Sequence, residues 1–236
     1  MLSLFRKKPY IHFWSIFNDL EKVEPITKAV KTMPDWFKNL KAYPNQDPLV
    51  DAGTVKMCPS FIQYYKSLYT LKLWCDVKLV IDDDYYEWYT PDGRFSFDAH
   101  NKVQMKDHLP EHEKNNTKII LKANCPWRCK TSKNYMLMQL PCTYHYNDLF
   151  DVPPGFIQTH TYHELNPQMI FRKKGTFLLE RGIPICHYLL VRNEEADFKV
   201  MSKAEHFKID PTYEDIMKTK FQRSMKEKLH DEPSEN

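Results

Sequence analysis

Three histidines and one cysteine lie among short apolar runs in the segment from 152 to 192. His160 and His163 form an HxxH-like pair, and His145 and His187 lie on either side of that pair in the sequence. Imidazole nitrogens are common ligands of zinc and iron. If this chain holds a metal ion, these four histidines are the expected ligands. The first question is whether the fold can bring them together.

The residues around the HxxH-like pair favour a strand over a helix, because Thr159, Thr161 and Tyr162 prefer extended backbone. Successive side chains of a strand point to opposite faces, so His160 and His163 would diverge. A single ion could bind both only at a bulge. We therefore favour neither a metal nor another cofactor, and interpret the histidines as hydrogen-bonded residues in the wall of a β-structure.

Other catalytic patterns are missing from the sequence. It contains no GxSxG, P-loop or GxGxxG, and its six cysteines form no CxxC pair. Cys125 and Cys129 have a spacing that zinc sites use, but no second ligand pair accompanies them. We expect both to pack as small apolar residues. The run from Asp82 to Asp84 is interpreted as a solvated turn, since calcium loops spread their ligands further. Whether the chain is an enzyme stays open.

Composition and charge indicate a β-rich protein. The 236 residues are 14% aromatic and include 16 prolines but only 5 glycines, which favours short strands separated by turns. The formal net charge of +3 comes from interspersed charges, so nucleic-acid binding is not indicated. No apolar run is long enough to span a bilayer, and no cleavable signal pattern is present. We expect a cytoplasmic protein with no membrane partner.

The chain divides into three predicted parts. Residues 1–57 form an irregular, proline-broken arm that packs on the core through Trp36 and Phe37. Residues 58–200 form a β-rich core domain. Residues 201–236 form an amphipathic helix followed by a disordered tail.

The core shows the clearest periodicity. Apolar side chains alternate over 71–81, which predicts one strand with a buried face. A short helix is expected to start at Pro59, and 101–117 is predicted to be a polar loop. Further strands are expected at 85–89, 94–98, 118–123, 135–140, 156–165, 168–171, 177–179 and 183–191. Such a series predicts a single mainly β domain, either a barrel or a sandwich.

Three stretches carry a resemblance to a known family: KANCPWRCKTSKNYMLMQLP, VPPGFIQTHTYHELN and GTFLLERGIPICHYLLVR. Together with MPDWFKNL and VKMCPSFIQYYKSLYTLKLWCDV, they resemble an uncharacterised protein family of marine tailed phages and some bacteria. The resemblance covers most of residues 33–192. It implies a phage accessory protein, located in the cytoplasm of an infected host cell or associated with the virion. It implies no specific activity.

Residues 153–192 also resemble, more distantly, the last two motifs of trimeric dUTPases and dCTP deaminases, which share a β-clip fold. The first motif corresponds to 155–157 (GFI) and the second to 182–184 (GIP). Gln158 stands where dUTPases have the aspartate that positions the attacking water, and His187 stands where a glutamine is expected. Glutamine cannot act as a carboxylate base. The resemblance therefore implies a β-clip-like scaffold with a nucleotide ligand, while the standard hydrolysis is in doubt.

Three functions follow from these observations. The first is an accessory β-domain that binds an unidentified protein partner or self-associates as an oligomer. The second is a nucleotide-processing enzyme on a β-clip scaffold, and the third is a metal enzyme that uses the four histidines. The candidate ligand-binding residues are His160, His163, His187, Gln158 and Tyr162. The aromatic residues expected at an interface are Tyr64, Tyr65, Trp74, Tyr86 and Trp88.

Overall fold

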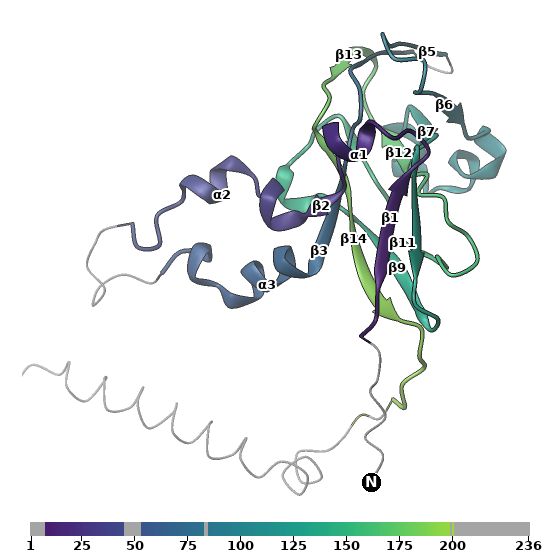
Figure 1. Ribbon diagram of the computed structural model, residues 1–236. Helices are drawn as coiled ribbons and strands as arrows, with labels where there is room; N and C mark the ends of the chain where they lie inside the picture. Colours follow the sequence, from purple (N-terminus) through teal and green to yellow (C-terminus); the bar gives the residue numbers. More distant parts are fainter. Residues whose placement is uncertain (1–7, 45–52, 83–84, 199, 201–236) are drawn as a thin grey trace, which may run out of the picture. The chain divides into compact units, whose positions relative to one another are not determined.

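The structure is a computed structural model that describes residues 8–44, 53–82, 85–198 and 200 (Figure 1). The chain divides into two units, Met1–Asn193 and Glu194–Asn236, and all the described helices and strands belong to the first. The helix and tail predicted for 201–236 lie outside the described residues, as do two of the three aspartates of the run at 82–84.

The described part of the first unit is mainly β. Its strands are β1 (Ile11–Ser15), β2 (Thr27–Lys28), β3 (Leu68–Lys72), β4 (Val77–Ile81), β5 (Tyr86–Tyr89), β6 (Phe97–Ala99), β7 (Ile119–Ala123), β8 (Trp127–Thr131), β9 (Tyr135–Pro141), β10 (Phe150–Asp151), β11 (Gly155–Ile157), β12 (Gln168–Phe171), β13 (Gly175–Leu179) and β14 (Pro184–Arg192). They pair antiparallel in four sheets, with strand orders β11-β9-β14-β3-β2, β10-β12-β7-β6, β13-β4-β5 and β1-β8. None of these sheets closes into a barrel within the described residues, which is consistent with a sandwich-like class of packed open sheets.

The helices of the described part are short. The α-helices are α1 (Leu20–Val23), α2 (Asp35–Asn39), α3 (Pro59–Ser67) and α4 (Glu111–Asn116). The 3-10 helices are η1 (Ala29–Thr32), η2 (Val55–Met57), η3 (Lys102–Gln104), η4 (Lys106–His108) and η5 (Thr143–His145). None of them combines the length and the apolar character that a membrane crossing requires.

One large apolar core lies among the sheets. The alternation predicted over 71–81 is confirmed in its burial, because Leu71, Leu73, Val77 and Leu79 are all fully buried. The core also contains Cys125, Cys129 and Cys186 as free thiols, as expected for cysteines that pack as small apolar residues. Burial raises the pKa of the Cys129 thiol to about 12, so this sulfur is held as a neutral group.

A second, smaller core lies under a helical lobe, which we define as α2, α3, η1, η2 and η5. Figure 1 shows α2 and α3 on one side of the sheets. Pro59 opens α3 at its first turn, as predicted, and the helix buries Phe61 and Tyr65. Phe37 of α2 stacks on Phe61 of α3 with ring centroids 4.3 Å apart.

Several local predictions are wrong. Residues 71–81 form two strands in different sheets, because the chain bends between β3 and β4. Residues 156–165 form only the short β11, followed by a turn. The predicted loop at 101–117 contains η3, η4 and α4. The arm at 1–57 is less irregular than expected, since its β1 pairs with β8 and its β2 pairs with β3.

Candidate binding surface

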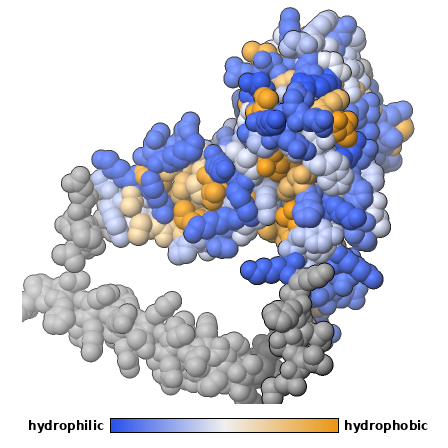
Figure 2. Space-filling model, viewed as in Figure 1, coloured by the Kyte–Doolittle hydropathy of each residue, from blue (hydrophilic) through white to orange (hydrophobic). Residues whose placement is uncertain are grey.

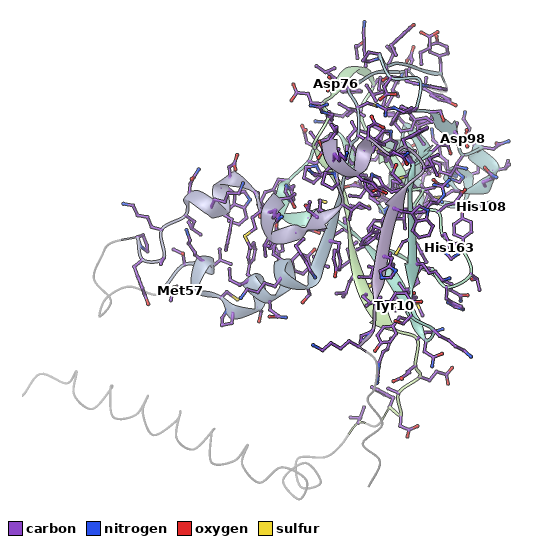
Figure 3. The ribbon with its side chains drawn as sticks, viewed as in Figure 1. Tyr10, Met57, Asp76, Asp98, His108 and His163 are labelled. Atoms are coloured by element: carbon purple, nitrogen blue, oxygen red, sulfur yellow. The ribbon has the colours of Figure 1, made fainter. Side chains whose placement is uncertain are left out.

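The four histidines occupy two separate places. His160 and His163 follow β11, and Figure 3 shows His163 beside the sheets, away from the lobe that carries Met57. His145 and His187 lie together where η5 of the lobe meets β14, with ring centroids 5.9 Å apart. Among the described residues, no group of three or more histidines, cysteines and carboxylates could hold a metal ion. The structure therefore does not assemble the four-histidine ligand set.

His187 is part of a buried chain of hydrogen bonds. Thr32 donates its hydroxyl proton to the carbonyl of Ala29 at 3.1 Å, so its oxygen must accept from the hydroxyl of Thr70 at 2.8 Å. The Thr70 oxygen then accepts from Nδ1 of His187 at 3.0 Å. This direction fixes the tautomer of His187, with the proton on Nδ1. These hydrogen bonds connect η1 of the lobe to β3 and β14.

The surroundings of His187 keep it neutral. Its side chain is 1% exposed. Burial, with a smaller contribution from His145, lowers the pKa of His187 to about 3. Burial also lowers the pKa of His145, and its Nε2 is buried with no hydrogen-bond partner among the described residues. The rings of Tyr64 and Tyr65 complete the surroundings of His187. His187 therefore holds the lobe on the sheet and is poorly accessible to a ligand.

The other four candidate residues lie on a turn. The N–H groups of Thr161 and Tyr162 both donate to the carbonyl of Gln158, at 3.0 and 2.9 Å. Gln158, His160 and Tyr162 are exposed there. On a strand these three residues would share one face, and on the observed turn they are likewise all exposed to solvent. They are therefore accessible, whereas His187 is not.

His163 anchors this turn and is half-buried. Its Nδ1 lies 2.9 Å from the carbonyl of Thr159 and 3.0 Å from the carbonyl of Cys129. Carbonyl oxygens only accept, so Nδ1 carries the proton. The ring packs against Trp14 with centroids 5.7 Å apart. The interpretation of His163 as a hydrogen-bonded residue of the β-structure agrees with this geometry.

An apolar sheet face next to this turn is open. Leu68, Leu189, Met138 and Phe156 are successive partners across β3, β14, β9 and β11. Leu68 is 1% exposed under the lobe, Leu189 and Met138 are half-buried, and Phe156 is 63% exposed. The lobe thus covers one end of this row and leaves the other end open. Figure 2 shows apolar surface on the lobe and where the lobe meets the sheets.

The exposed aromatic residues differ from those predicted for an interface. Tyr65 is fully buried because it faces the smaller core, and Trp74 is fully buried in a segment that is covered on both sides. Tyr64, Tyr86 and Trp88 are half-buried. Six other aromatic side chains of the described residues are more than half exposed: Tyr85, Tyr89, Tyr146, Phe156, Tyr162 and Phe198.

Sequence reasoning missed Phe156 as a candidate binding residue. The sequence places it only in the GFI segment that resembles a β-clip motif and in the predicted strand at 156–165. The signal that could have identified it is the short GFI run between Pro153-Pro154 and a polar turn, because prolines confine a strand to the edge of a sheet. β11 is such an edge strand, and within the described part of the chain it pairs with β9 alone.

No protein-family model matches this chain, and a comparison with curated proteins finds no match. The two segments that resemble β-clip motifs lie at different places in the fold. Gly155 is level with Gln139 and, across β9, with Tyr188. Gly182 lies two residues before β14 begins at Pro184, and its N–H donates to the carbonyl of Leu73 at 2.8 Å.

Proposed function

We propose that this chain is an accessory β-domain protein of tailed-phage type that acts by binding and assembly. Its partner at the open edge is a second copy of the same chain. The observation that carries the proposal is the 63% exposure of Phe156 on a strand whose outer edge pairs with no other strand of the described residues. The proposal places the protein in the cytoplasm of an infected host cell, with virion association as a further location.

The edge strand is self-complementary. β11 has three residues, and Phe156 is the middle one. If two copies pair antiparallel about a two-fold axis at Phe156, the five-stranded sheet continues into that of the partner, because each strand supplies the backbone groups the other lacks. The two Phe156 rings then lie side by side, each flanked by its own Met138. Burying a phenylalanine side chain contributes about 1.5–3 kcal/mol.

An edge mutation tests this proposal. Sedimentation equilibrium of the full chain, from micromolar to submillimolar concentration, should show a dimer for the wild type. Phe156→Glu should be monomeric, because it places like charges together in an apolar contact. Leu178→Glu is the matched control, since Leu178 is 62% exposed on β13, a strand of another sheet. A monomeric wild type, or equal dimerisation of both variants, would contradict the proposal.

The finer fold assignment and the nucleotide ligand are part of the same proposal. The resemblance of residues 153–192 to β-clip motifs implies a deoxynucleoside triphosphate ligand, which we propose binds beside the exposed Gln158. A thermal shift panel of the four deoxynucleoside triphosphates tests this, because a ligand that binds only the folded state raises the melting temperature. No shift with any of the four would remove the nucleotide from the proposal and leave the assembly test unaffected.

A further inference from the structure

A polar cleft lies where β1 ends and β8 begins, and one of its lining segments, 164–166, follows the turn after β11. It has a volume of about 360 Å³, within the range of roughly 300–1,000 Å³ for small-molecule sites. Four chain segments line it, and each contributes one of the residues Phe17, Arg94, Asn124 and Glu164. Segments so distant in sequence meet here for two reasons. β8 pairs with β1, and Glu164, which follows the 158–163 turn, forms an isolated β-bridge with Arg128.

Hydrogen bonds fix the polar side chains of the cleft before any ligand arrives. Asn124 donates its side-chain amide to the hydroxyl of Ser96 at 2.9 Å. Asn166 accepts from the N–H of Cys125 at 2.9 Å and donates to Glu164 at 2.8 Å. The exposed Tyr162 donates its hydroxyl to the same carboxylate at 3.0 Å. Preorganised groups lose less entropy on binding than free side chains do.

The two arginines of the cleft are already neutralised. Arg94 is paired with Asp92 and Asp19, and Arg128 with Glu164. Two guanidinium groups therefore face three carboxylates, so the cleft has no excess of positive charge that would attract a free anion. The pKa of Glu164 lies below its usual value, mainly because the Tyr162 hydroxyl donates to this carboxylate and further because Arg128 is close.

Both guanidinium groups keep N–H groups that can donate a hydrogen bond to a ligand. Each guanidinium has five N–H groups. Arg94 uses Nε, one hydrogen on Nη1 and one on Nη2 for its two carboxylates. Arg128 uses Nη1 for the carbonyls of Cys125 and Trp127 and one hydrogen of Nη2 for Glu164. The hydroxyl of Ser96 accepts from Asn124 and keeps its own hydrogen. The cleft therefore offers fixed donors next to carboxylate acceptors.

An apolar wall completes the cleft. The ring of Phe17 is half-buried and lies under the guanidinium of Arg94, at 5.4 Å from its carbon to the ring centroid. Ile16 stands next to it and is 55% exposed. A ligand seated here meets an aliphatic and aromatic surface on one side and hydrogen-bonding groups on the other.

We propose that this cleft binds a neutral saccharide, such as the terminal hexose of a glycan. Sugar hydroxyls both donate and accept, which matches guanidinium and amide donors placed beside carboxylates. Their C–H faces are apolar and match the wall formed by Phe17 and Ile16. A phosphate or a free carboxylate would compete with acidic partners that the arginines already have. This inference is independent of the assembly at β11.

Ligand-observed NMR and thermal shift on the full chain test the proposal. The panel contains glucose, galactose, mannose and N-acetylglucosamine, with inorganic phosphate and a deoxynucleoside triphosphate for comparison. At least one saccharide should transfer saturation from the protein and raise its melting temperature in a concentration-dependent way. Binding of phosphate or the nucleotide with no saccharide binding, or no binding at all, would overturn the proposal.

Two variants place the binding in this cleft. Ser96→Ala removes one hydroxyl, and Asn124→Ala removes the amide that positions it, so each should weaken saccharide binding about tenfold or more. Ser132→Ala is the control, because Ser132 is on another turn, where it accepts from the N–H of Tyr10 at 2.8 Å. The melting temperature of each unliganded variant shows whether it is folded. Saccharide binding that is equal in folded Ser96→Ala, Asn124→Ala and Ser132→Ala would contradict the assignment.

Discussion

Acid should loosen the attachment of the helical lobe through His187. In the folded protein burial holds the pKa of this imidazole at about 3, whereas in the unfolded chain it has the ordinary value of about 6.5. Between these two values the unfolded state binds the proton and the folded state does not. The free energy of unfolding therefore falls as the pH is lowered below about 6.5, and this contribution is constant above that value.

The size of the effect follows from the same two values. Each pH unit in this window costs about 1.4 kcal/mol, so lowering the pH from 7 to 5 should remove about 2 kcal/mol through His187. His145 contributes in the same direction, because burial lowers its pKa too. Carboxylates such as Asp92 and Asp98, whose pKa values are lowered by Arg94 and by Lys122, respectively, lose their stabilising effect in more acidic solution. The window from pH 7 to 5 therefore reports mainly on the histidines.

Urea denaturation of three proteins at pH 7, 6 and 5 measures this dependence. His187→Asn keeps an amide donor near the position of Nδ1 and removes the titrating ring, so it should be less stable at pH 7 but depend less on pH. His112→Asn is the control, since its side chain is 75% exposed, and it should keep the wild-type dependence. If the wild type loses no stability between pH 7 and 5, or if His187→Asn loses as much as the wild type, the reasoning is refuted.

Two further substitution pairs test the fold. Leu179 is fully buried and its neighbour Leu178 is 62% exposed, so Leu179→Ala should cost about 2–5 kcal/mol in urea denaturation and Leu178→Ala less than about 0.5 kcal/mol; equal losses would contradict the alternation of β13. Gly182 has a φ of 92°, so Gly182→Ala should cost about 1–2 kcal/mol. Gly93→Ala meets nothing within 4 Å and should change stability by less than about 0.5 kcal/mol; a loss as large as that of Gly182→Ala would refute the backbone argument.

Local patterns in the sequence predicted many of the elements well. The predicted strand at 168–171 coincides with β12, and the helix beginning at Pro59 is α3. Alternation over 71–81 identified the buried side chains, although it could not show the bend that divides them between two sheets. Such periodicity depends only on neighbours in the chain, and for this reason it is readable from one sequence.

Features that depend on distant contacts could not be predicted. Trp74 is expected from the sequence at an interface, yet it is 1% exposed, because tertiary packing covers both sides of that segment. His160 and His163 are expected from the sequence to diverge along a strand, but they lie at a turn after β11. His187 lies elsewhere, beside His145. The cleft beside Arg94 and Arg128 joins four distant segments, and no local pattern marks it.

Disulfide cross-linking at the centre of β11 tests the proposed assembly most directly. Residues directly opposite in an antiparallel pair have Cα atoms about 4.5–5.5 Å apart, which lies within the range for a disulfide. Under mild oxidation, Phe156→Cys should therefore form a covalent dimer on a non-reducing gel. The wild type, with its own six cysteines, and Leu178→Cys should stay monomeric on the same gel. A Phe156→Cys chain that cross-links no more than Leu178→Cys would contradict pairing of the two edge strands.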